Sequence, residues 1–214
     1  TIAVHIDGAA VGGTMAYGSH TDYVAIAGGA GDRLIEVLRD GEVVISETYT
    51  LADGDTSVVV VGDDNVVPLD LLVLAENVDE PGVGHAGLRI THAAVLGATI
   101  DDTKVDVCSQ TGELFNGSAA GLRYLRTTSN RLLPIGDYDL KITRTDAAGD
   151  CAGPIAIDPP VLTLAEGTKT NLFLVGDGHN RVLAVFTFAD GLIGDDGPPP
   201  SSGTLYLPVL AASS

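Results

Sequence analysis

Five histidines are the residues with the most versatile chemistry in this chain, because a neutral imidazole can bind a metal ion or transfer a proton. They are His5, His20, His85, His92 and His179. No two of them have the i, i+4 spacing that brings two metal ligands together on one helix. We expect surface or strand-end positions for them. The exception is His92, which lies inside an apolar segment and is predicted to be a buried residue with structural hydrogen bonds.

Clustered carboxylates could supply the hard oxygen ligands that Ca²⁺ prefers. The clusters are Asp53 with Asp55, Asp63-Asp64, Asp101-Asp102 and Asp195-Asp196. None of them has the ligand spacing of a known calcium loop. Solvated turn carboxylates are the simpler interpretation, so the sequence predicts no cofactor and no obligatory metal, with structural Ca²⁺ as the alternative.

Motifs for covalent catalysis are missing from the sequence. Neither a GxSxG elbow nor an SxxK pair is present to supply an activated serine. The glycine-rich segment Gly28 to Asp32 does not open a helix, so we do not expect it to cradle a phosphate. The sequence therefore predicts a protein that is not an enzyme.

Two cysteines, Cys108 and Cys151, stand without a CxxC motif or a Cys/His cluster. This favours one disulfide over a metal site, and a reduced buried pair is the alternative. Asn116-Gly117-Ser118 has the form of an N-glycosylation sequon. Ser201, Ser202 and Thr204 lie beside a proline run and have the composition of an O-glycosylated stalk.

Composition narrows the class of protein. The 214 residues contain 11 Lys and Arg against 29 Asp and Glu, a formal charge of -18, so the basic surface that nucleic acids need is absent. The hydrophobic share of 45% indicates a globular chain. No apolar run is long enough to span a membrane. The chain begins at Thr1 without a leader, so we expect a processed, secreted protein.

The elements that must position these residues are strands, because apolar residues alternate with a period of two. Segment 32–39 could be drawn as a short helix, but Gly31 and Asp40-Gly41 bracket it as a strand between turns. The spacing of the turns is typical of a β-sandwich. The expected strands are 32–39, 42–49, 56–61, 70–76, 88–94, 104–108, 138–144, 171–175 and 183–188.

An internal repeat organises the chain. TLADGDTSVVVVGD (Thr50 to Asp63) reappears as TLAEGTKTNLFLVGD (Thr163 to Asp177), and Gly31-Asp32 corresponds to Gly136-Asp137. IAVHI (2–6) can be laid on KVDVC (104–108). We therefore expect an all-β chain with two sandwich domains, residues 1–83 and 84–193, followed by a proline-serine linker and a strand in 194–214.

The two copies differ at their beginnings. Copy two has a strand-like segment, LRITHAA (88–94), before the point at which copy one starts. After copy two comes a spare apolar segment, TLYLPVLAA (204–212). Copy one thus lacks an opening strand, and the chain carries one strand too many at its end.

The segments LRITHAA, VDV (105–107), PIGDYDLKI (134–142) and TLAEGTKTNLFLVGD, with AYG (16–18) and TDYVAI (21–26) in copy one, resemble the DUF4397 family of bacterial and archaeal extracytoplasmic domains. The resemblance covers a tandem pair up to about residue 192. It implies immunoglobulin-like sandwiches at a cell surface and no catalytic residues. Copy one departs from the family in lacking the opening strand and the histidine that His92 provides in copy two.

These observations favour a structural subunit whose partners are copies of itself. The expected donor strand is Thr204, Leu205, Tyr206, Leu207, Pro208, Val209 and Leu210, which would complete copy one of the next chain, and the expected acceptor is the strand with Ile2, Val4 and Ile6. Because Pro208 has no N–H, we expect the donor at a sheet edge.

Alternatives stay open for the tail and for the whole protein. The tail could be a sorting tag, or it could fold back on its own chain. The protein could instead be a monomeric adhesion or sugar-binding module, or a secreted enzyme of unrecognised type.

Overall fold

The chain folds into strands in two compact units. A computed structural model describes residues 1–21, 24–25, 29–52, 56–62, 68–75, 80–96, 103–117, 120–145, 151–177, 182–190, 204–206 and 208–209. These residues form β-strands joined by turns and contain no α-helix, so the predicted all-β class is confirmed. Unit 1 comprises residues 1–78 together with 197–214, and unit 2 comprises residues 79–196.

The first sheet of unit 1 is antiparallel throughout. Its order is β2 (Ala9–Met15), β1 (Ile2–Ile6), β5 (Gly31–Arg39) and β6 (Glu42–Leu51). Alternation along β5 buries Ile35 and Val37 completely, which explains why the ambiguous segment 32–39 is a strand rather than a helix.

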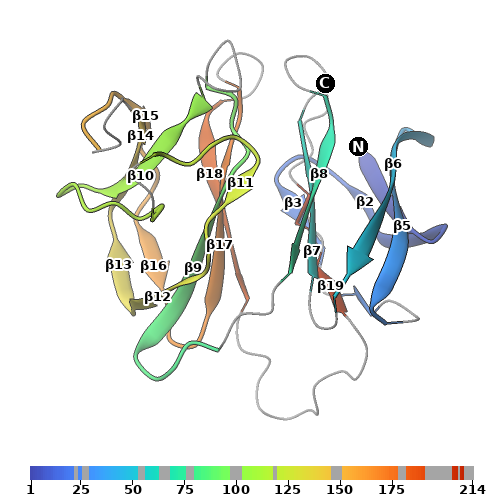
Figure 1. Cartoon of the computed structure of the whole chain (residues 1–214), viewed down its shortest axis with the longest axis horizontal. Helices are drawn as coiled ribbons and strands as arrows, with labels where there is room; N and C mark the ends of the chain where they lie inside the picture. Colours follow the sequence, from blue (N-terminus) through green and yellow to red (C-terminus); the bar gives the residue numbers. More distant parts are fainter. Residues whose placement is uncertain are drawn as a thin grey trace. The chain divides into compact units, whose positions relative to one another are not determined.

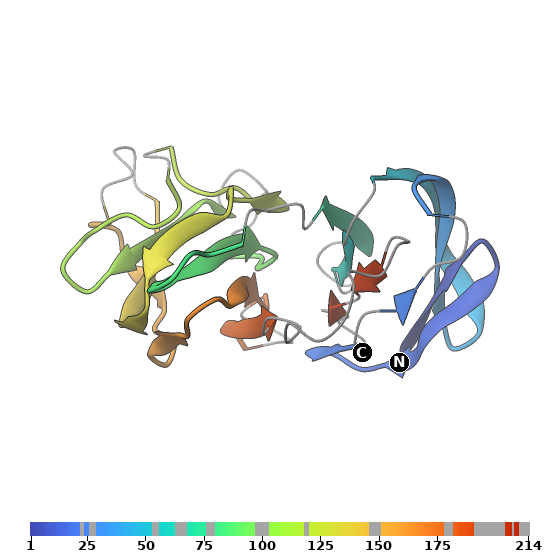
Figure 2. The same cartoon turned by 90° about the horizontal axis from the view of Figure 1, so that it is seen from below.

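The second sheet of unit 1 contains the C-terminal segment of the chain (Figure 1). Its order is β4 (Val24–Ala25), β19 (Thr204–Tyr206), β7 (Thr56–Val61) and β8 (Asp70–Ala75). A further short pair joins β20 (Pro208–Val209) to β3 (Ser19–His20). Figure 2 shows the same red strands beside the teal β7 and β8 from a second direction. The tail therefore lies within the unit formed by the beginning of the chain.

Unit 2 is built on the same plan with its own opening strand. One sheet is centred on β9 (His85–His92) and β17 (Lys169–Val175), which pair with each other. The other edge of β17 pairs with β18 (Ala184–Asp190), and the other edge of β9 pairs with two short strands, β11 (Arg126–Thr127) and β12 (Arg131–Pro134). The opposite strands are β10 (Val105–Ser109), β14 (Leu140–Arg144) and β15 (Ile155–Ile157), with β13 (Gly136–Tyr138) paired to β16 (Leu162–Leu164).

Each unit has one hydrophobic core, to which both of its groups of strands contribute. The core of unit 1 includes Val4, Ile35 and Val37 from the first sheet and Val58 and Val60 from the second. The core of unit 2 takes its buried side chains from the corresponding strands, including Leu88 and Ile90 of β9. In both units, the alternating side chains of these strands hold the two groups together.

The predicted disulfide is present in unit 2. The bond joins Cys108 of β10 to Cys151, the first residue described before β15, across 43 positions of sequence. Neither cysteine lies in unit 1.

The register of the strands corrects one detail of the internal repeat. Val4 pairs with Val37, and Val107 pairs with Ile142, so IAVHI corresponds to VDVCS (105–109) and not to KVDVC one residue earlier. The earlier alignment would have matched core residues of one copy with outward residues of the other, because neighbouring residues of a strand face opposite sides. In the corrected alignment Ile2 and Val4 match the fully buried Val105 and Val107.

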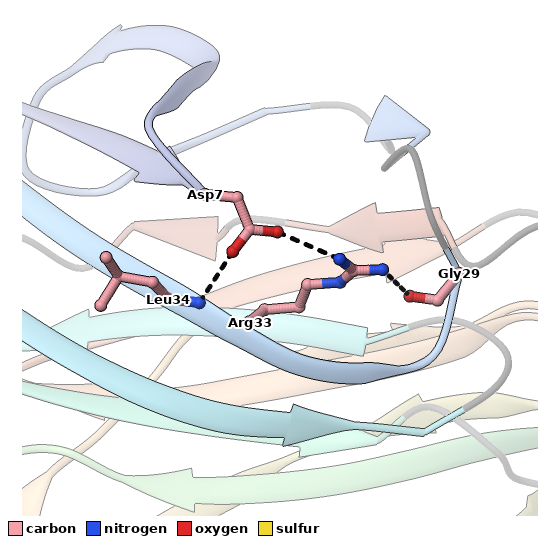
Figure 3. A network of polar contacts seen from close by, with 4 residues as sticks. All are labelled: Asp7, Gly29, Arg33 and Leu34. Carbon is pink, nitrogen blue, oxygen red and sulfur yellow. Dashed lines mark hydrogen bonds and ion pairs between the residues drawn. The ribbon is translucent and has the colours of Figure 1, made fainter.

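A polar network secures the first hairpin of unit 1 to the start of β5 (Figure 3). Asp7 occupies the turn after β1 with a φ of 49°. Its carboxylate accepts hydrogen bonds from the backbone N–H of Leu34 at 3.0 Å and from Nη1 of Arg33 at 3.1 Å. The other Arg33 nitrogen, Nη2, donates to the carbonyl of Gly29 at 2.8 Å. The carboxylate thus links the turn after β1 to the start of β5, and Arg33 extends the network to Gly29.

Candidate functional site

The structure does not test the metal-binding alternative. Within the described residues no group of three or more His, Cys, Asp or Glu could hold an ion, but the carboxylates that the alternative names are not among them. The four acidic clusters, at 53 and 55, 63–64, 101–102 and 195–196, lie outside the described residues, as does His179. Of the other histidines, His5 lies on β1, His20 on β3 and His85 at the start of β9.

His92 is the buried structural residue that the sequence predicted. It is 0% exposed, and its ring meets Tyr124 edge to face with centroids 6.2 Å apart. Nδ1 accepts the backbone N–H of Ala94 at 3.3 Å, which assigns the ring proton to Nε2, the donor to the carbonyl of Thr103. Burial lowers the pKa of His92 to about 4, while the hydrogen bond to Thr103 acts in the opposite direction. The imidazole is therefore neutral at pH 7.

The most distinctive site is the slot in unit 1 that the C-terminal strand fills. β19 runs parallel to β7, with Leu205 opposite Thr56 and Tyr206 opposite Ser57. On its other side it runs antiparallel to β4, with Leu205 opposite Val24. The tail is hydrogen-bonded into the sheet from both sides and forms an inner strand.

The tail occupies the same place in unit 1 as β9 does in unit 2. β9 runs parallel to β17 with Leu88 opposite Thr170 and Arg89 opposite Asn171. In the internal repeat Thr56 corresponds to Thr170, so Leu205 takes the position of Leu88 and Tyr206 that of Arg89.

The pairing on the other side gives the same correspondence independently. His92 lies opposite Arg126 in β11, and Val209 lies opposite Ser19 in β3. Leu88 lies opposite Arg131 in β12, as Leu205 lies opposite Val24 in β4. A constant offset relates Ser19 to Arg126 and Val24 to Arg131, so all the pairings agree on one register for the tail.

A backbone feature supports this offset. Gly18 and Leu125 correspond under it, and both adopt a left-handed conformation, with φ of 74° and 56°. Such a conformation is uncommon for a residue other than glycine, so its recurrence marks the same turn in the two units.

The expected acceptor strand is corrected by these pairings. Ile2, Val4 and Ile6 lie in β1, which pairs with β2 along one edge and with β5 along the other. Because both edges of β1 are occupied, β1 has no free backbone groups with which to receive a further strand. The strands that receive the tail are β7, β4 and β3.

The expected edge position of the donor is corrected as well. β19 lies between β4 and β7, and in the described residues β20, which contains Pro208, is paired with β3. Leu207 and Leu210 lie outside the described residues.

The sequon asparagine is engaged inside unit 2. Asn116 is 6% exposed, and its Oδ1 accepts the backbone N–H of Val107 at 3.1 Å. An N-linked glycan needs an exposed amide, so the folded unit does not present Asn116 for modification. Ser118, Ser201 and Ser202 lie outside the described residues.

Comparison with known families found one match, to the first part of the chain. Residues 1–101 match the family described as "Domain of unknown function (DUF4397)", so this part of the chain is similar to DUF4397 domains. The match runs through the chain's first strands and beyond β9. No curated protein matches the chain. In the described part of the chain, no helix is long and apolar enough to cross a membrane.

Proposed function

We propose that this protein is a non-catalytic structural subunit of an extracellular filament, in which the C-terminal strand of one chain completes unit 1 of the next. The observation that supports the proposal is the register of the tail. The position that β9 fills in unit 2 is filled in unit 1 by a strand from the far end of the chain. A strand attached through a separate segment can be supplied by another copy, whereas β9 is continuous with the rest of its own unit.

An unfilled slot in unit 1 would be costly. Without the tail, β7 and β4 would each lose a partner along one edge, and unpaired strand edges invite pairing with other chains. Leu205 takes the register position of Leu88, whose side chain is buried in unit 2, and burial of one leucine side chain contributes about 1.5–3 kcal/mol. Unit 1 is therefore expected to bind a strand at all times.

The structure of the single chain places the tail in its own unit 1. Closure within one chain and exchange between chains make the same contacts, so the linker and the protein concentration decide between them. The stiff prolines 198–200 disfavour tight return of the tail. An exchanged strand makes a heterologous contact, and repeated exchange without ring closure produces a fibre.

Secretion is part of the proposal. The disulfide belongs to an oxidising compartment, and the excess of acidic residues suits a solvated extracellular surface. The sandwich domains would be immunoglobulin-like, as the family resemblance implies. The alternative function is a monomeric surface adhesion or sugar-binding module. This alternative is favoured if the tail of each chain pairs with unit 1 of the same chain.

Cysteine cross-linking separates the two functions. The double variant Ser57→Cys/Tyr206→Cys places two thiols at directly opposed positions of β7 and β19. In a filament, mild oxidation should give a ladder of covalent multimers on a non-reducing gel, and mixing the two single variants should give dimers. Val60→Cys/Tyr206→Cys, which is out of register, is the matched control. Monomer as the only product, together with an absence of filaments in negative-stain images, would overturn the proposal in favour of the monomeric module.

A further inference from the structure

The opening strands of the two units share an apolar position but differ in their polar residues. Leu205 of the tail takes the register position of Leu88, which is 1% exposed in the core of unit 2. The neighbouring positions carry Tyr206, Pro208 and Val209 in the tail, against Arg89, Thr91 and His92 in β9. An apolar anchor common to both strands cannot tell the two slots apart, so any selectivity must come from the positions that differ.

We infer that these differing positions form a recognition code, by which the tail of a second copy enters the slot of unit 1 and is rejected by the slot of unit 2. The inference rests on the proposed function for its biological use. It concerns strand selectivity, which can be measured whether or not filaments form.

The first element of the code is the pair at positions 89 and 171. Nε of Arg89 donates to Oδ1 of Asn171 at 2.7 Å, between residues directly opposite each other in β9 and β17. The corresponding positions in unit 1 are Tyr206 and Ser57. A tail in the slot of unit 2 would place tyrosine opposite Asn171 and remove the guanidinium donor from that amide.

The second element is position 92. His92 donates to the carbonyl of Thr103 and accepts the N–H of Ala94 inside the core of unit 2. The tail has Val209 at this position, and valine can neither donate nor accept. In the slot of unit 2 it would leave the carbonyl of Thr103 without its His92 donor, which is the costly case for buried polar atoms.

The third element is position 91. Oγ1 of Thr91 lies 3.0 Å from Oγ1 of Thr127 across the β9–β11 pair. The tail has Pro208 at this position, opposite His20. Proline offers neither a hydroxyl nor a backbone N–H, so this position also favours β9 in unit 2 and excludes the tail.

Cross-linking in the full-length protein tests the selectivity directly. Tyr206→Cys combined with Ser57→Cys should cross-link, either within a chain or between chains. Tyr206→Cys combined with Asn171→Cys should give less than about a tenth of that yield, since one lost buried hydrogen bond already costs close to a factor of ten. Equal yields with the two partners would overturn the inference. Cross-links to Ser57→Cys only within single chains would defeat the filament and leave the selectivity intact.

A transplanted pair tests the residues of the code. Tyr206→Arg should raise the rate of amide hydrogen exchange in β7, because the tail then leaves its slot more often. Ser57→Asn in the same chain recreates the Arg–Asn pair of unit 2 and should recover about five-fold or more of that protection, in the range of coupling between contacting residues. Thr56→Asn, one residue away and facing the other side of β7, is the control and should give no recovery. Strictly additive effects of Tyr206→Arg and Ser57→Asn would contradict the code.

Discussion

The sheet of unit 1 that contains the tail and the sheet of unit 2 that contains β9 have the same pairing of strands but complete it by different means. Unit 2 contains its opening strand, β9, and secures it with the Arg89–Asn171 bond and the buried His92, and its disulfide joins β10 to the segment before β15 in the other group of strands. Unit 1 receives residues 204–209 from beyond unit 2 and has neither cysteine. The comparison teaches that a unit can be made dependent on a detachable strand without any change in its sheet order. It also shows that unit 2, which contains its own opening strand, has hydrogen bonds of Arg89 and His92 that the tail of unit 1 cannot form.

Removal of the tail should change the relative stability of the two units more than any other change. Deletion of Gly197 to Ser214 should lower the stability of unit 1 by roughly 5 kcal/mol or more, and Leu205→Asp should lower it by at least about 1.5–3 kcal/mol through the loss of apolar burial. Both changes should leave unit 2 unchanged. Hydrogen exchange resolved by segment measures both units in one sample. Leu88→Asp is the matched variant and should destabilise unit 2 alone. Full protection of β7 in the deleted chain would show that the tail is dispensable.

Loss of the disulfide should have the next largest effect, in the opposite unit. Cys108→Ala/Cys151→Ala opens a loop of 43 residues, and the loop-entropy account assigns about 3–4 kcal/mol to its closure. Calorimetry should show a lower unfolding temperature for unit 2 and an unchanged one for unit 1. The native protein should contain no thiol that reacts with an alkylating reagent before reduction, and two reactive thiols would refute the bond.

Acid should destabilise unit 2 in a way that unit 1 does not share. The folded pKa of His92, about 4, lies below its ordinary value of 6.5, so the unfolded chain binds the proton more tightly. The stability due to the neutral ring is fully present above pH 6.5 and falls by up to about 3 kcal/mol as the pH approaches 4.

Denaturant unfolding of unit 2 between pH 7 and pH 4 measures this effect. His92→Phe should remove that part of the pH dependence, whatever its effect on stability at pH 7. An unchanged slope in that variant would mean that other groups are responsible.

The smallest expected effect concerns the ion pair of unit 1. Asp7→Asn keeps a residue that tolerates positive φ and removes the charge next to Arg33, so it should cost at most about 1 kcal/mol. The loss should shrink in high salt, because the pair is partly exposed. Asp40→Asn, at the positive-φ turn between β5 and β6, is the control. If the loss of stability does not depend on salt, the geometry of the turn, and not the charge of Asp7, is its cause.

Much of the fold could be predicted because its strongest signals are local. Segment 56–61 ends in four consecutive valines, and β7 has those bounds. β2 was not predicted, because Gly12 and Gly13 interrupt its alternation. Both have positive φ, within a bulge where Val4 pairs with Val11 and Ala3 with Thr14. A side chain at position 12 would meet Thr21, so the glycine is required there by space as well as by conformation.

The candidate site could be predicted only in part. The count of strands revealed the missing one and the spare one. Of the three strands that pair with the tail, β7 was predicted, but β3 and β4 have two residues each and no readable period. The choice of β1 as acceptor placed the new strand beside the first strand in the sequence. Strand order in a sheet follows from long-range pairing, and no local pattern in Ile2, Val4 or Ile6 shows that both edges of β1 are taken.

The parallel pairing of β19 with β7 also has a consequence for biosynthesis. Leu205 and Thr56 are partners in the sheet, yet the whole of unit 2 is translated between them. Domains usually fold in the order of synthesis, and contacts of such long sequence separation form late. Here the order is reversed, so that the second unit reaches its native state while the first still waits for its last strand. Until residues 204–206 have been made, the edge of β7 with which they pair is therefore expected to stay open.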